Sequence, residues 1–133
     1  MTMEEKVQAI LIASPPVTAL VPASRIMTPG GNTQNVAKPY VVHFPVAPAG
    51  TTLTHSGLAV LQECDVYQIS IFADKYSSGR NISKAILGVL QGTFSDGTTI
   101  NPRGTVPRYI RDDETETDQM ILEFDIHEEL NLS

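Results

Sequence analysis

The chain has 133 residues and a mass of 14.4 kDa, enough for one domain with a single hydrophobic core. Hydrophobic residues make up 41 % and charged residues 18 %, a composition typical of a globular protein and not of a disordered one. The sequence contains no apolar run of about 18 residues, which excludes a membrane-spanning helix, and its net charge of −6 disfavours the class of nucleic-acid-binding proteins.

The charge is distributed unevenly along the chain. All nine basic residues lie in residues 1–111 together with six acids, whereas residues 112–133 hold nine acids and no Lys or Arg. The N-terminal segment carries acids where a signal peptide needs positive charge, so export by that route is not expected. The single cysteine, Cys64, excludes an intrachain disulfide.

The first predicted element is a helix from about Met3 to Ala13. Thr2 and Glu5 form a capping-box pattern at its start, and the pair Pro15 and Pro16 ends it. The apolar residues of this segment recur at helical spacing and form one stripe: Met3, Val7, Ile10 and Leu11.

Residues 14–60 are rich in proline and poor in charge. Seven of the nine prolines fall here, and the only charged residues are Arg25 and Lys38. The segment from Tyr40 to Phe44 has strand propensity, and Pro45 predicts its end, which suits an edge strand. We expect long loops at about 28–38 and 47–57.

A long strand and an amphipathic helix are predicted next. Residues 58–73 alternate so that Tyr67, Ile69 and Ile71 share one face. Residues 77–91 follow helical periodicity, with a serine cap at the start and Gly92 at the end. The apolar face of this helix consists of Ile82, Ala85, Ile86, Val89 and Leu90.

The chain ends in a predicted hairpin. A strand over 106–112 is followed by a hydrophilic turn over 112–118 and by a half-buried strand that carries Met120, Leu122, Phe124 and Ile126 on one face. The order helix, strand, long strand, helix, strand, strand predicts an α+β fold, a mainly antiparallel sheet with two helices packed on one face. We expect a single domain over residues 1–133.

Catalytic signatures are absent from the sequence. It has no phosphate-binding loop, nucleophile elbow, zinc motif or Cys-x-x-Cys pair. The spacing of His43, His55 and His127 does not require a metal site, and Cys64 has no base beside it in sequence, which favours a small core residue. We therefore predict no catalytic, cofactor-binding or metal-binding residues, and no enzyme.

The acidic turn has three interpretations. It is a solvated hairpin tip, a weak cation site, or a patch that meets basic residues of a neighbouring subunit and so sets register and orientation. The cation site lacks the glycine of a calcium loop. The candidate subunit-interface residues are Arg103, Arg108, Arg111, Asp112, Asp113, Glu114, Glu116 and Asp118.

The order of these segments resembles that of the tail completion family of long-tailed bacteriophages and prophages, which includes tail-terminator and head–tail joining proteins. The resemblance covers nearly the whole chain and depends on order and spacing. Its segments are residues 3–11, 17–21, 25–26, 38–42, 65–74 and 76–80, and the closing hairpin with Asp112-Asp-Glu and Glu123-Phe-Asp-Ile126.

The resemblance implies a structural virion protein without cofactor or enzyme activity. It implies a ring, commonly a hexamer, at the head-proximal end of the tail tube, assembled in the bacterial cytoplasm. The expected partners are other copies of the chain, the tail-tube protein and head-completion or connector proteins. DNA is expected to pass through without specific binding, which an acidic chain suits, and no membrane is involved.

Two alternatives remain open. The first is that the chain is another neck or minor tail protein of the same fold. The order of neighbouring genes would distinguish such a protein from a tail terminator. The second is that the chain is a small cytoplasmic ligand-binding or enzymatic α+β domain. Such a domain would need a pocket lined by polar groups such as His43, His127 and the acidic turn.

Overall fold

The computed structural model describes residues 3–29, 37–53, 60–94, 98–104 and 106–131. The helices are α1 (Met3–Ile12), α2 (Pro15–Thr18) and α3 (Tyr76–Val89), with a 3-10 turn at Ala23–Arg25. The strands are β1 (Ile26–Met27), β2 (Tyr40–Leu53), β3 (Val60–Ala73), β4 (Gly92–Thr93), β5 (Thr99–Pro102), β6 (Arg108–Asp112) and β7 (Thr117–Asn131).

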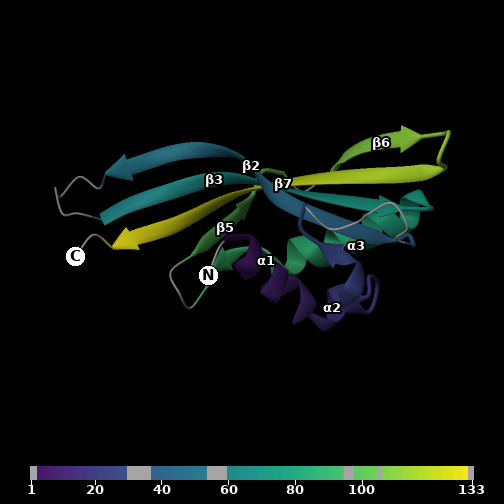
Figure 1. Ribbon diagram of the computed structural model, residues 1–133, viewed down its shortest axis with the longest axis horizontal. Coiled ribbons are helices and arrows are strands. Elements are labelled where there is room, and N and C mark those ends of the chain that lie inside the picture. Colours follow the sequence, from purple (N-terminus) through teal and green to yellow (C-terminus); the bar gives the residue numbers. More distant parts are fainter. Residues whose placement is uncertain (1–2, 30–36, 54–59, 95–97, 105, 132–133) are drawn as a thin grey trace.

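All seven strands belong to one sheet, and the helices cover one of its faces (Figure 1). The strand order is β1-β2-β3-β7-β5-β4, and β6 pairs with β7 beside β5. The pair β1–β2 is parallel and the other pairs are antiparallel. The predicted α+β fold class is confirmed.

The core lies between the sheet and the helices. In β3, the side chains of Tyr67, Ile69 and Ile71 are fully buried, as their alternation predicts. Alternate residues of β7 and the apolar stripes of α1 and α3 complete the core: Met120, Leu122, Phe124, Ile126, Val7, Leu11, Ile82 and Ile86. Burial of each such side chain contributes about 1.5–3 kcal/mol to folding.

The two predicted helices form, and α1 begins at Met3 as expected, whereas α3 begins one residue earlier than predicted. Thr2 of the predicted capping box lies outside the described residues. The serine cap of the second helix is wrong, because α3 begins at Tyr76 and its N-cap is Lys75, which makes no side-chain cap hydrogen bond. Gly92 has a φ of +103°, a conformation that favours glycine and that takes the chain away from α3.

Strand β2 continues beyond the predicted stop at Pro45. The strand runs to Leu53, so residues 47–53 are not the expected loop; residues 54–59 lie outside the described residues, as do residues 30–36 of the other predicted loop. The register with β3 shifts at Pro45/Ala47 and at Pro48/Gly50. These irregularities let a strand accept prolines, because a bulge removes ladder hydrogen bonds locally.

The short strands were not predicted. Strands β1, β4 and β5 have two to four residues each, too few for a period to be recognised. Strand β1 covers Val41 and Val42 at the start of β2, so β2 is an edge strand only beyond that point. These short segments become strands because they pair with longer neighbouring strands.

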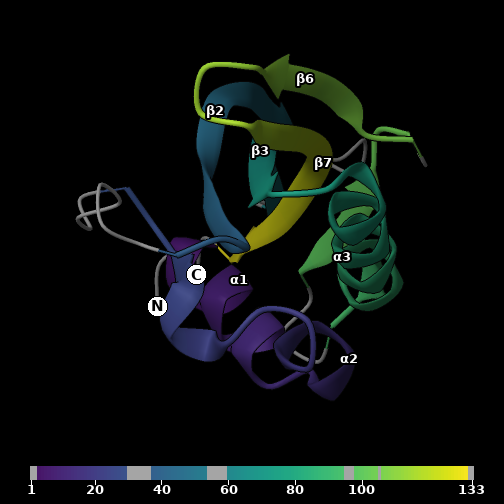
Figure 2. The ribbon, with the colours of Figure 1, turned by 90° about the vertical axis from the view of Figure 1, so that its right-hand side faces the viewer.

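Strands β5 and β6 share one side of β7. Residues 99–102 pair with the later part of β7, and residues 108–112 with its first part. The sheet curls away from the helices, and the turn between β6 and β7 comes over the start of β2 (Figure 2). Strands that are distant in sheet order therefore approach each other at this end of the molecule.

Candidate interaction surfaces

The acidic turn between β6 and β7 is held by an arginine across the hairpin. Arg111 is the strand partner of Asp118, and its guanidinium lies 3.2 Å from Asp118 Oδ2 and 3.2 Å from Asp113 Oδ1. Asp118 is only 4 % exposed and also accepts a hydrogen bond from the Tyr109 hydroxyl, which raises the pKa of Tyr109. Arg111, Asp113 and Asp118 thus stabilise the hairpin within one chain.

The other carboxylates of the turn face solvent. Asp112 accepts a hydrogen bond from the Glu114 amide at 3.1 Å, and its hydrogen bonds with Thr115 and Glu114 lower its pKa. Glu114 and Glu116 are exposed, and Glu116 has a φ of 51° in the turn. The predicted hydrophilic turn is confirmed, and three of its carboxylates point outward.

The two remaining predicted interface arginines lie away from the turn. Arg103 follows β5, and its guanidinium lies 2.7 Å from Asp125 and 4.0 Å from Glu123 on β7. Arg108 begins β6, is exposed, and has no hydrogen bond or ion pair within the described part of the chain. Of the three arginines, only Arg111 meets the acidic turn in this chain.

Lys38 ties the start of β2 to the hairpin. Its Nζ donates hydrogen bonds to Thr117 Oγ1 at 2.8 Å and to the Thr115 carbonyl at 3.0 Å, and lies 3.3 Å from Asp74 Oδ1. Sequence reasoning missed this role. The only signal was that Lys38 is one of two charged residues in a long charge-poor region.

His43 is part of a buried chain of hydrogen bonds. The Gln8 amide Nε2 donates to the Ile26 carbonyl at 2.8 Å, which leaves Gln8 Oε1 to accept from His43 Nε2 at 2.6 Å. His43 Nδ1 then accepts from the Tyr67 hydroxyl at 2.6 Å. Burial lowers the pKa of His43 to about 4, partly opposed by the charge of Glu4, so the ring is neutral.

The polar pocket required by the ligand-binding alternative is not found in the described residues. His43 is fully buried in the core, His127 lies on β7, and the acidic turn lies at the hairpin tip. His55 and the side chain of Cys64 are outside the described part. Within the described ranges, no group of three or more His, Cys, Asp or Glu residues is placed to hold a metal ion.

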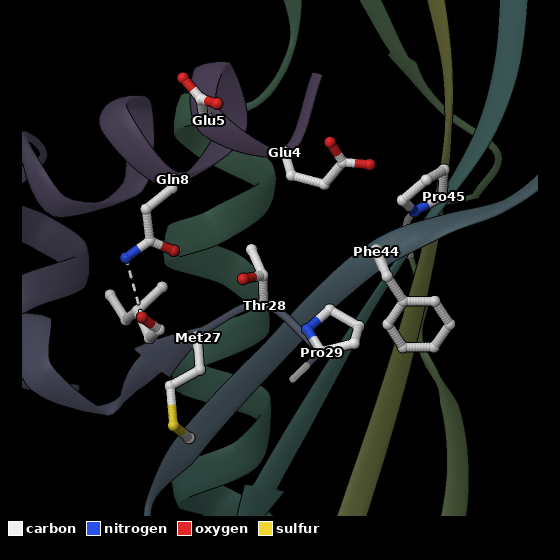
Figure 3. A pocket seen from close by; sticks show the side chains of 9 residues that line it. Glu4, Glu5, Gln8, Met27, Thr28, Pro29, Phe44 and Pro45 are labelled. Carbon is white, nitrogen blue, oxygen red and sulfur yellow. Dashed lines mark hydrogen bonds between the residues drawn. The ribbon is translucent and has the colours of Figure 1, made fainter. Parts of the chain in front are cut away.

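A groove of about 900 Å³ opens between α1, β1 and β2 (Figure 3). The lining residues are Glu4, Glu5, Gln8, Ile26, Met27, Thr28, Pro29, Phe44 and Pro45. Glu4 extends from α1 across the groove toward Pro45, whereas Glu5 stays at the helix side (Figure 3). The groove therefore combines a carboxylate with an apolar wall.

A second surface surrounds the start of α3. The rings of Tyr76 and Tyr109 meet edge to face, with centroids 5.1 Å apart, and remain 51 % and 44 % exposed. Tyrosine is one of the residue types that are enriched among the energetic hot spots of protein interfaces. Lys75 and Lys84 of the same region are exposed.

These features define a small α+β protein whose candidate functional sites are exposed surfaces. They are a hairpin with an outward acidic turn, an acidic groove beside α1, and a tyrosine-bearing surface at α3. Among the helices in the described ranges, none is long and apolar enough to cross a membrane.

Comparison with known proteins identifies the family. Residues 5–129 match the family described as "Tail completion protein gp17", so the chain belongs to this family of phage tail structural proteins. The fold is similar to that of a chain in the solved structure of the "Virion of native gene transfer agent (GTA) particle", with a TM-score of 0.75, 17 % identity, and coverage of 96 % of this chain and 95 % of that chain. No protein with a curated description matches the sequence. The family resemblance seen in the order of the segments is confirmed.

Proposed function

We propose that this protein forms a ring at the head-proximal end of a phage tail tube, where it ends tail growth and joins the tail to the head. Membership of the tail completion family carries this proposal. It is supported by two different surfaces, the groove beside α1 and the half-exposed Tyr76 and Tyr109 near α3, because a closed ring needs two different patches on each copy. A ring of six, as the resemblance implies, is our working stoichiometry.

The hairpin is proposed to contact a neighbouring protein of the neck. Arg103, Arg111, Asp113 and Asp118 are engaged within the chain. The members of the predicted interface set that remain directed outward are Arg108, Asp112, Glu114 and Glu116. The turn between β6 and β7 lies at one end of the long axis of the molecule (Figure 1), where the next protein along the tail would meet it.

The chain is proposed to act as one non-catalytic domain through which DNA passes. A net charge of −6 on each copy makes the ring repel the DNA backbone, so DNA moves through without being retained. The partners are the tail-tube protein and the head-completion or connector proteins. The ring is a virion component and assembles in the host cytoplasm.

Deletion of the gene in a phage or prophage tests this function. We expect tail tubes without a defined end that fail to join heads, and purified protein added to such tubes should cap one end in electron micrographs. Tubes of normal length that lack heads would instead indicate a neck protein that acts after termination. Normal infectious particles would contradict the proposal.

A further inference from the structure

Two flanks of the subunit carry opposite charge. The first turn of α1 contributes Glu4 and Glu5 to the groove beside β2. Residues 75–92, which include all of α3, contain Lys75, Arg80 and Lys84 and no acid. The start of α1 thus carries two acids, followed by Lys6, whereas the exposed charged residues of the segment around α3 are Lys75 and Lys84.

The acidic flank holds a carboxylate that the described structure leaves without a hydrogen bond or ion pair. Glu4 is only partly exposed and reaches into the groove (Figure 3). Its side chain extends from α1 toward Pro45 on β2 (Figure 3). The opposite wall of the groove, with Met27, Phe44 and Pro45, is apolar.

The basic flank, the exposed side of α3 with Lys84, leaves room for another protein surface to approach the helix closely. Lys84 and Gly88 lie one turn apart on the exposed side of α3, and a Cβ atom built at Gly88 meets nothing within 4 Å. Lys84 has no hydrogen bond or ion pair in the described ranges. The buried Nη1 atom of Arg80 also has no partner there.

The two flanks face different ways. Helix α1 packs on β1 and β2, whereas α3 packs on β3 and β7. Viewed along the strands, the first turn of α1 and the outer side of α3 stand on opposite sides of the molecule (Figure 2). Complementary patches of this kind join copies head to tail, and repetition of the contact closes a ring when the rotation between neighbouring copies divides a full turn.

We infer that the groove between α1 and β2 receives helix α3 of a second copy of this chain, with Lys84 of one copy at Glu4 of the next. This assignment rests on the ring proposed above and names the surfaces that build it. The apolar wall buries the stem of Lys84 and the small residues of α3, while the ion pair sets the orientation of the two copies.

Charge reversal tests the assignment. Glu4→Lys and Lys84→Glu are each expected to lower the fraction of protein in rings by at least about tenfold, because each places like charges in contact. The variant that carries both reversals should restore rings. The measurement is solution mass by light scattering with electron microscopy, on the full chain alone and on tail tubes.

Two further variants make the result specific. Gly88→Glu adds a bulky acid to open space on α3, so it should fold normally by circular dichroism and still lose rings. Asn101→Lys adds a charge to an exposed position of β5, outside both flanks and outside the hairpin, and should keep the ring mass of the wild type.

The possible failures are distinguishable. If the wild type forms rings and both single reversals leave them intact, or the double variant is no better than the singles, the groove assignment is overturned and the ring remains. If the wild type stays monomeric both in solution and on tail tubes, the proposed function itself fails.

Discussion

The hydroxyl of Tyr67 donates a hydrogen bond to Nδ1 of His43, at 2.6 Å, in the middle of the hydrophobic core. Gln8 accepts from the other ring nitrogen, so every polar atom of the imidazole has a partner. The bond joins β2 to β3, and Gln8 of α1 bonds to His43 on β2 and to Ile26 on β1. This polar chain fixes the position of the helix over the sheet, because a shift of α1 would leave buried polar atoms without partners.

His43 makes stability depend on pH. Its pKa is lowered by burial from 6.5 to about 4 in the folded state, so the unfolded chain binds the additional proton. We expect the free energy of unfolding to fall as the pH falls from 6.5 to 4, by about 3 kcal/mol from this group. Urea unfolding at several pH values measures the effect.

The control for the pH prediction is His43→Gln, which keeps polar atoms at the site and does not titrate. The difference in unfolding free energy between wild type and variant should change with pH in this window. A constant difference would show that His43 does not cause the loss.

Lys38 should stabilise the hairpin turn. Lys38→Met removes its hydrogen bonds to Thr115 and Thr117 and its ion pair with Asp74. Because the Lys38 side chain is partly exposed to water, we expect a loss of about 1 kcal/mol of unfolding free energy. Hydrogen exchange should become faster at the amides of the turn. Lys75→Met, which removes an exposed lysine without such contacts, should change neither quantity.

Asp118 should be the strongest single contact of the hairpin. Asp118→Ala removes a buried carboxylate that accepts a hydrogen bond from Tyr109 and pairs with Arg111. We expect a loss of about 2–3 kcal/mol of unfolding free energy, as for hydrogen bonds to a charged group. Thermal or urea unfolding measures it. Asp113→Ala, which removes the exposed partner of Arg111, should cost less than 1 kcal/mol, roughly the value of a surface ion pair. Equal losses of unfolding free energy in the two variants would show that the burial of Asp118 does not strengthen its contacts.

Two glycines of α3 should respond in opposite directions to alanine. A Cβ atom at Gly79 would lie 3.0 Å from Met120 Cγ, and Met120 is fully buried. Gly79→Ala should therefore destabilise the fold by about 1–2 kcal/mol through overpacking. Gly88→Ala meets open space and should stabilise it by up to about 1 kcal/mol. Differential scanning calorimetry of both variants tests the pair, and a stabilising Gly79→Ala would show that Met120 moves aside freely.

The regular elements were predictable because their signals are local. The alternation around Tyr67 and the helical spacing around Ile82 each describe one face of one element, and the structure buries those faces. The predicted end of β2 at Pro45 was wrong because it also relied on a local signal. A proline disfavours a strand locally, whereas pairing with β3 on the other side and two register shifts carry the strand past it.

The sequence by itself determined the fold class, the core faces of β3, α3 and β7, the hydrophilic turn and the resemblance to the tail completion family. Only the tertiary structure decided which charges find partners. Arg111 and Asp118 meet because the hairpin register places them opposite each other, and Lys38 reaches Thr117 because the sheet curls. His43 became a neutral core residue, and Glu4 came to face a groove, through contacts between elements far apart in the chain. Such pairings depend on the relative positions of whole elements, which no local pattern of residue types specifies.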